Sequence, residues 1–339
     1  MNSLLIGTFV MGGLGLILSL ILVVAYLKLN VPPNPLEEKI RKLLPGANCG
    51  GCGFPGCDAY AESLSKRESL PNLCPVGGQP LVDRLAKLLG QGVEEMKKMI
   101  AFSICKGGDN FCTRSFEYKG VNTCKAAHIV GGGGKDCVYG CLGYGDCEKA
   151  CPFYAITMSD NRIPIVDSEK CTGCGICVEV CPRDVMQLIP YDKVVYLACR
   201  SLEKGLVVKN ICKVGCFGCG ICVRVCPYDA LTMEDNIPVM DFEKCTDCGI
   251  CYQKCPTNSY IDRTPERPKA VIGSKCMGHG ECVKVCQFKA IEGDSGEKHK
   301  VIADKCVGCG ECEKVCPEKA ITMEGGIPLL VEKEKKIAV

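Results

Sequence analysis

The sequence predicts an α+β protein in which a single N-terminal transmembrane helix is followed by a small cysteine-rich domain and three tandem units. Three observations support this prediction. The first 27 residues include no charged side chain, three later segments repeat one another around a Cys-Pro pair, and 32 of the 339 residues are cysteine. A long uncharged run predicts a membrane span, a repeat predicts an array of similar units, and this cysteine content predicts a disulfide or metal scaffold.

The composition narrows the class of protein further. Regular cysteine spacing and the lack of an export signal favour a metal array over a secreted disulfide scaffold. The 41 basic and 39 acidic residues nearly balance, which argues against nucleic acid as a partner. The chain has no Trp and only 6% aromatic residues, so a large hydrophobic core is not expected. Bound metal clusters would then have to stabilise the small domains.

The N-terminal segment, residues 1–29, is predicted to be a permanent membrane anchor. The run from Leu4 to Leu27 is almost entirely apolar and long enough to span the hydrocarbon layer. A cleaved signal peptide would need positive charge before the run and small residues after it, and neither is present. Basic residues follow the helix, beginning at Lys28, and none precedes it. This asymmetry predicts a single-pass protein of the inner (plasma) membrane with its bulk in the cytoplasm.

Internal repeats divide the remainder of the chain. The segment Cys151-Pro-Phe-Tyr-Ala-Ile-Thr-Met158 is echoed at Cys226–Met233 and again at Cys316–Met323. We predict these domains: a four-cysteine domain (30–90), a linker with a cysteine-bearing arm (91–135), unit 1 (136–190), a second cysteine-bearing arm (191–211), unit 2 (212–262), and unit 3 with a tail (263–339).

The cysteine spacing identifies the cofactor. The pattern C-x2-C-x2-C-x3-C-P occurs four times, starting at Cys171, Cys216, Cys245 and Cys306. In this pattern three thiolates wrap one 4Fe-4S cluster, and the fourth cysteine ligates the neighbouring cluster of a bacterial-type, two-cluster ferredoxin. Zinc would instead favour four-ligand knuckles. Each unit is therefore predicted to be a ferredoxin-like fold with two clusters.

Exchange of the fourth cysteine between paired runs gives the predicted ligand sets. For unit 2 these sets are Cys216, Cys219, Cys222 with Cys255, and Cys245, Cys248, Cys251 with Cys226. For unit 1 they are Cys171, Cys174, Cys177 with Cys151, and a stretched run of Cys137, Cys141, Cys147 with Cys181. For unit 3 the normal set is Cys306, Cys309, Cys312 with Cys286.

The second site of unit 3 departs from the pattern. It retains only Cys276, Cys282 and Cys316, and His279 stands where the second cysteine belongs. Three outcomes stay open: a three-iron cluster, a four-iron cluster with His279 as the fourth ligand, or loss of the cluster. Histidine ligation raises the potential of other iron–sulfur centres, so the exchange could tune this site.

Upstream of the repeats, a compact motif carries Cys49, Cys52 and Cys57 among glycines and is completed by Cys74 before a proline. Four cysteines form a full ligand set for a sixth cluster, with zinc as the rival occupant. Five cysteines then remain. We hypothesise that Cys105, Cys124, Cys199 and Cys212 form an eighth site, the alternative being that these and Cys112 are buried free thiols.

With these residues in view, the chain resembles the RnfB family, whose members belong to the Rnf complex, a membrane-bound ferredoxin:NAD oxidoreductase. The resemblance rests on the anchor, the motif at 44–57 with Cys74, and Gly140-Cys141-Leu-Gly-Tyr-Gly-Asp-Cys147 before Cys151-Pro-Phe153. It implies that electrons enter from a soluble ferredoxin and leave toward other membrane subunits of a complex that pumps Na⁺ or H⁺. His279 lies outside the part shared with shorter family members.

The function predicted from the sequence is therefore an electron relay with no catalytic site of its own. No proton-transfer dyad, nucleophile elbow or nucleotide-binding loop is present, and the glycine run at 131–134 lacks the context of a dinucleotide site. Two other functions stay open at this stage. One is the wiring of another membrane redox enzyme, such as a hydrogenase, and the other is a structural zinc array.

Overall fold

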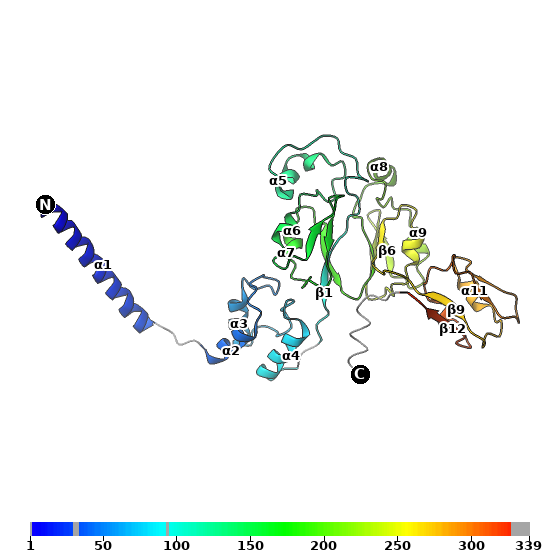
Figure 1. The fold of residues 1–339 in the computed structure, drawn as a ribbon, viewed down its shortest axis with the longest axis horizontal. Helices are drawn as coiled ribbons and strands as arrows, with labels where there is room; N and C mark the ends of the chain where they lie inside the picture. Colours follow the sequence, from blue (N-terminus) through cyan, green and yellow to red (C-terminus); the bar gives the residue numbers. More distant parts are fainter. Residues whose placement is uncertain (1, 30–33, 93–94, 327–339) are drawn as a thin grey trace.

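The computed structural model describes residues 2–29, 34–92 and 95–326 (Figure 1). Helix α1 (Asn2–Leu29) extends away from the rest of the chain. Its segment Ile6–Lys28 has a mean hydropathy of 2.5, is long and apolar enough to cross a membrane, and is not buried against any other part of the described chain. The predicted tail from residue 327 onward lies outside the described residues.

The four-cysteine domain is a small helical body. It contains α2 (Pro35–Leu43), α3 (Cys57–Ser65) and α4 (Gly78–Leu89). The apolar faces of these helices meet around fully buried Ile40, Tyr60 and Leu64. Cys52, Cys57 and Cys74 pack against the same core, so the ligands predicted from the motif lie at the edge of the only apolar interior this small domain has in the described residues.

Unit 1 is formed by two antiparallel strand pairs. Strand β2 (Ile156–Met158) pairs with β3 (Pro164–Val166), and β1 (Met99–Ser103) pairs with β4 (Met186–Pro190). The short helices α6 (Asp146–Ala150) and α7 (Ile176–Glu179) follow the cysteine loops. Strand β1 comes from the predicted arm at 91–135, upstream of the boundary predicted at 136. Its side chains from Ile100 to Ser103 are buried, which is why this segment belongs to the core of unit 1.

Between β1 and α6 the chain makes an excursion that contains α5 (Cys124–Ile129) and a glycine turn, Gly131–Gly134. Thr123 caps α5 by accepting a hydrogen bond from the Ala126 N–H at 3.2 Å. The Lys125 N–H donates to the Asp146 carboxylate at 3.2 Å, so the start of α5 is attached to the start of α6.

Units 2 and 3 repeat the arrangement. In unit 2, β5 (Val195–Leu197) pairs with β8 (Tyr260–Asp262) and β6 (Leu231–Glu234) with β7 (Ile237–Met240). In unit 3, β9 (Lys269–Ile272) pairs with β12 (Ile321–Glu324) and β10 (Ile291–Glu292) with β11 (Lys300–Val301). The remaining helices are α8 (Gly205–Ile211), α9 (Ile221–Arg224), α10 (Ile250–Gln253), α11 (Glu281–Val285) and α12 (Glu311–Lys314). Strand β5 again comes from a segment predicted as an arm, 191–211.

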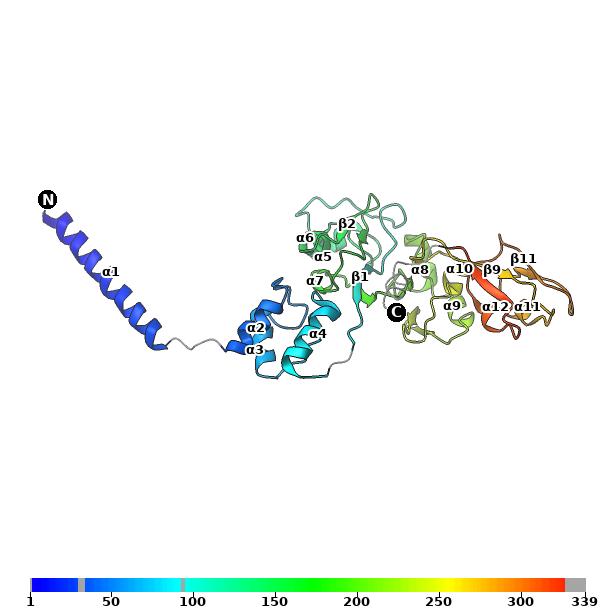
Figure 2. The same cartoon turned by 60° about the horizontal axis from the view of Figure 1, so that its bottom comes forward.

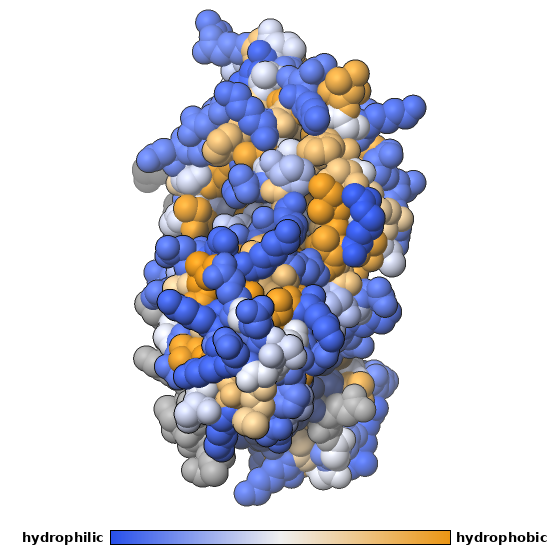
Figure 3. Space-filling model, turned by 90° about the vertical axis from the view of Figure 1, so that its right-hand side faces the viewer, coloured by the Kyte–Doolittle hydropathy of each residue, from blue (hydrophilic) through white to orange (hydrophobic). Residues whose placement is uncertain are grey.

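The domains follow one another in sequence order from the membrane helix to unit 3 (Figure 2). Neighbouring domains touch through backbone and polar contacts. Arg200 donates to the backbone oxygens of Arg183 and Asp184 between units 2 and 1, and Tyr228 of unit 2 donates to Glu311 of unit 3 at 2.5 Å. The face at the unit 3 end is mainly hydrophilic, with apolar residues in small separate groups (Figure 3).

Candidate metal centres

Each regular cysteine run folds as a loop followed by one helical turn. A glycine in the left-handed conformation joins the two parts, for example Gly175 (φ 85°) before α7 and Gly310 (φ 76°) before α12. The next cysteine, such as Cys177 or Cys312, lies in that turn and is buried. The loop therefore brings three sulfurs of one run to the same side, which is the arrangement that the spacing predicted.

The fourth cysteine of each run is held by a repeated hydrogen bond. Its sulfur accepts the backbone N–H four residues later, at 3.3–3.4 Å, in Cys151, Cys181, Cys255, Cys286 and Cys316. Such bonds fix the direction of a ligand and stabilise charge on its sulfur, and hydrogen bonds to sulfur set the potential of a cluster.

Two regular sites enclose cavities of nearly equal size. Cys226, Cys245, Cys248 and Cys251 line about 350 Å³ of space in unit 2, and Cys286, Cys306, Cys309 and Cys312 line about 360 Å³ in unit 3. In the described residues, no three cysteine, histidine or acidic side chains converge closely enough to hold a single metal ion. Four sulfurs around an open space suit a multi-iron cluster better than one zinc ion, so these residues fit the 4Fe-4S group.

The cysteines of three further predicted sites are also neighbours. Burial, followed by Cys171 and Cys174, raises the pKa of Cys177 to about 12 in unit 1. Burial, followed by Cys199, Cys222 and Cys255, raises that of Cys216 to about 12 in unit 2. In the N-terminal domain, burial raises the pKa of Cys74, and Cys52 and Cys49 add to the shift.

These shifts have a chemical meaning for the sites. A cluster ligand must be a thiolate, whereas burial in a protein interior favours the neutral thiol. Positive charge from iron would offset this cost, and in its absence the sulfurs would stay protonated.

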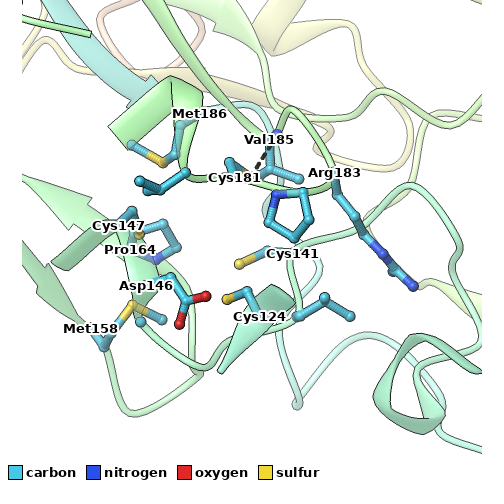
Figure 4. A pocket seen from close by; sticks show the side chains of 14 residues that line it. Cys124, Cys141, Asp146, Cys147, Met158, Pro164, Cys181, Arg183, Val185 and Met186 are labelled. Carbon is cyan, nitrogen blue, oxygen red and sulfur yellow. Dashed lines mark hydrogen bonds between the residues drawn. The ribbon is translucent and has the colours of Figure 1, made fainter. Parts of the chain in front are cut away.

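The fourth cavity differs from the prediction. Cys141, Cys147 and Cys181 line about 380 Å³ of space in unit 1, and the fourth cysteine that lines it is Cys124 (Figure 4). Cys137, predicted for this set, is not among the lining residues. The sulfur atoms of Cys124 and Cys141 lie next to each other and point into the cavity, while Arg183 extends away from it (Figure 4).

Cys137 lies instead with four of the five remaining cysteines. The Cys112 side chain is within hydrogen-bonding reach of both Cys137 and Cys212, and Cys112 and Cys212 form an antiparallel β-bridge. Burial raises the pKa of Cys199 to about 11, with Cys105 and Cys137 among the groups that add to it. The hypothesised set of Cys105, Cys124, Cys199 and Cys212 is therefore not brought together, because Cys124 lies in the cavity of unit 1.

The histidine beside the altered site of unit 3 is His299 and not His279. The Nδ1 atom of His299 lies 3.8 Å from the sulfurs of both Cys276 and Cys282, and the residue is only 3% exposed. The His279 side chain is 45% exposed, and its Nε2 lies 4.0 Å from Glu318. Sequence spacing pointed to His279 because it occupies the missing cysteine position. His299 follows a turn and reaches the site only through the fold of the β10–β11 hairpin.

Models of known families match the segments that carry these sites. An Fe-S cluster family model matches residues 44–76. A model for a 4Fe-4S dicluster domain matches residues 138–188 and 269–323, and another model with the same description matches residues 215–259.

Three curated relatives are B-type subunits of ion-translocating complexes. The one from the Na⁺-translocating ferredoxin:NAD⁺ oxidoreductase complex of Acetobacterium woodii is 41% identical over 72% of this chain and 74% of that protein. The one from an ion-translocating oxidoreductase complex of Methanosarcina acetivorans is 42% identical over 73% of this chain and 94% of its own length. The one from the proton-translocating ferredoxin:NAD⁺ oxidoreductase complex of Clostridium ljungdahlii is 41% identical over 72% of this chain and 87% of its own length.

Among solved structures, a formate dehydrogenase–heterodisulfide reductase–formylmethanofuran dehydrogenase complex from Methanospirillum hungatei matches 57% of this chain and 80% of its own chain. The identity is 22% and the TM-score 0.26, and we draw nothing from this match.

Proposed function

The chain belongs to the RnfB family of ion-translocating ferredoxin:NAD oxidoreductase complexes, and on that premise we propose that it is the membrane-anchored electron relay of such a complex. In this proposal, three tandem two-cluster ferredoxin-like units and the N-terminal four-cysteine domain hold 4Fe-4S clusters, which supply one-electron storage and transfer. Family membership favours this function over the wiring of a hydrogenase and over a zinc array.

The observation that carries the proposal is that the cysteine sites succeed one another along the molecule. The backbone of Gly51 in the four-cysteine domain meets that of Cys174 in unit 1. Within unit 1, Cys147 is a neighbour of Cys177, and within unit 2, Cys222 is a neighbour of Cys251. Cys248 of unit 2 is in turn a neighbour of Cys309 of unit 3. This sequence of contacts supports an order of transfer that follows the order of the domains.

The protein's own residues hold and tune these sites. Lys193 donates to the Cys245 carbonyl at 2.6 Å, and Arg267 donates to the carbonyls of Cys248 and Asp247 at 3.2 and 2.9 Å, so both cations secure the same ligand loop. Arg267 also pairs with the buried Asp262 at 2.5 Å. A rigid ligand loop limits the rearrangement that accompanies a change of charge, which favours fast electron transfer.

The anchor α1 would hold the relay beside its membrane partners and raise their effective concentration. Basic residues on the C-terminal side of α1 support a cytoplasmic position for the cysteine sites, where a soluble ferredoxin could donate electrons. Relatives equally similar to this chain are named for Na⁺ in one organism and for protons in another. We therefore assign the choice of coupling ion to other subunits.

The first experiment is to measure iron and acid-labile sulfide in the anaerobically purified fragment that starts after Asn30. Six regular clusters predict about 24 irons per chain, and the two irregular sites would raise this to about 32. The fragment should be brown, and reduced ferredoxin should bleach it in stopped-flow mixing. Iron far below 24 with zinc in its place would reject the relay. Full iron loading without reduction by ferredoxin would reject only the donor.

A further inference from the structure

We propose that Cys124, and not Cys137, completes the ligand set of the first cluster of unit 1, and that Cys137 joins Cys105, Cys112, Cys199 and Cys212 in a further iron–sulfur site between units 1 and 2. The proposal rests on the relay function to the extent that the chain must hold clusters at all. It concerns which side chains hold them, and nothing in the family matches assigns Cys124 or this group of five.

The first line of argument is the match between three cavities. Those in units 2 and 3 enclose about 350 and 360 Å³ and are lined by four cysteines that the regular motif would have predicted. The cavity in unit 1 encloses about 380 Å³ and is also lined by four cysteines. Since size and sulfur content agree, the third cavity has the same role, and its fourth sulfur is that of Cys124.

The chain holds Cys124 at this cavity by local structure. It is the first residue of α5, whose start is capped by Thr123. The bond from Lys125 N–H to Asp146 ties that start to α6, which carries Cys147. Cys124 is therefore placed by two hydrogen bonds beside a ligand from a different segment.

Cys137 is held in the other direction. Its carbonyl accepts a hydrogen bond from Arg183 at 2.6 Å, and its sulfur packs against Gly140, where an added Cβ would lie at 3.3 Å. The gaps after Cys137 and Cys141 are also longer than the two residues of the regular motif. A longer gap lets Cys137 leave the loop that holds Cys141 and Cys147.

The five remaining sulfurs converge at the boundary of units 1 and 2. A Cβ on Gly107 would lie 2.8 Å from the Cys212 sulfur and 3.9 Å from that of Cys105, so this glycine leaves room for both. The Cys105 sulfur accepts the Cys141 N–H at 3.4 Å, which sets the group directly behind the first cavity. On its other side, Cys199 is a neighbour of Cys216 in unit 2.

Two buried cations lie against this group. Lys135 is 5% exposed and donates to the carbonyls of Gly107 and Cys141 at 2.5 and 2.6 Å, and Arg183 is 8% exposed. In the part of the chain that the structure describes, neither cation pairs with a carboxylate, and the Nε of Arg183 has no hydrogen-bond partner. The acidic side chains of Asp109 and Asp184 pair with Arg114 and Arg200 instead.

A buried positive charge is costly unless a negative group faces it. A cluster bound by four thiolates carries net negative charge, so it would balance Lys135 and Arg183. Neutral free thiols would leave both cations uncompensated. The site would also fill the interval between the clusters of unit 1 and those of unit 2.

The test compares iron, sulfide and the EPR spectrum of the dithionite-reduced chain in Cys124→Ala, Cys137→Ala and Cys199→Ala variants. We expect about 28 irons or more in the parent chain and a loss of about four irons in each variant. The signal lost in Cys137→Ala should match that lost in Cys199→Ala and differ from that lost in Cys124→Ala. Thr123→Ala, which removes the cap of α5 but no thiol, should keep the full iron count.

Two outcomes would overturn the proposal. Full iron in Cys124→Ala, with the loss confined to Cys137→Ala, would restore the ligand set predicted from spacing. Full iron in both Cys137→Ala and Cys199→Ala would reject the site between the units. If Cys124→Ala fails to fold, Cys124→Ser replaces it, and a retained cluster with a shifted EPR signal is expected only when residue 124 is a ligand. Absence of iron from the parent chain would instead reject the relay itself.

Discussion

Gly51 packs directly against Cys174, so that a Cβ on Gly51 would lie 2.6 Å from the Cys174 carbonyl oxygen and 3.0 Å from its Cα. These two residues lie in the ligand loops of adjacent sites, one in the four-cysteine domain and the other in unit 1. The contact depends on the absence of a side chain, because real Cβ atoms do not approach backbone atoms this closely.

The Gly51→Ala variant should therefore separate two neighbouring clusters without removing a ligand. We expect unchanged iron content, weaker magnetic coupling between clusters in the reduced EPR spectrum, and slower internal electron transfer. Gly92→Ala is the matched control, since a Cβ there meets nothing within 4 Å. If coupling and transfer rates in Gly51→Ala equal those of the parent, the two domains do not exchange electrons across this contact.

A second contact joins units 2 and 3. The Tyr228 hydroxyl donates to Glu311, a side chain that is only 10% exposed, and Lys314 reaches both groups. Tyr228→Phe should leave Glu311 with one partner fewer and weaken the contact by about 1 kcal/mol. Amide hydrogen exchange in residues 306–314 should become roughly fivefold faster. Tyr154→Phe is the control because that ring is 84% exposed, and equal exchange in both variants would contradict the prediction.

The two histidines of unit 3 should respond differently to truncation. His299→Ala removes a buried ring between two cysteine sulfurs, and large-to-small changes of this kind cost about 2 kcal/mol or more. We expect exchange of the β10 and β11 amides to accelerate at least tenfold and the spectrum of any cluster held by Cys276, Cys282 and Cys316 to change. His279→Ala should alter neither. A change in the His279 variant alone would restore the assignment made from spacing.

The membrane helix should be separable from the rest of the chain. Because Ile6–Lys28 buries nothing against the other described residues, removal of residues 1–30 should leave iron per chain unchanged. The full chain should sediment with membranes and the shortened chain should remain in the supernatant. Loss of iron from the shortened chain would mean that the anchor supports the folded domains directly.

The sequence alone determined what depends on short separations along the chain. Twenty or more apolar residues make a membrane helix wherever they occur, and the motif at 44–57 and the four regular runs place three sulfurs on one loop because only a few residues lie between them. The repeat of these runs also predicted the exchange of fourth cysteines, and the cavities of units 2 and 3 are lined by cysteines in that arrangement.

Only the tertiary structure decided which distant segments meet. Strand β1 joins unit 1 by pairing with β4, more than eighty residues later, because its apolar side chains need a partner strand to be buried. Cys124 replaces Cys137 in the cavity because α5 folds back onto α6, and His299 replaces His279 because a hairpin turns it inward. Spacing in the sequence specifies a local loop, whereas the packing of separate segments selects which cysteine or histidine completes each site.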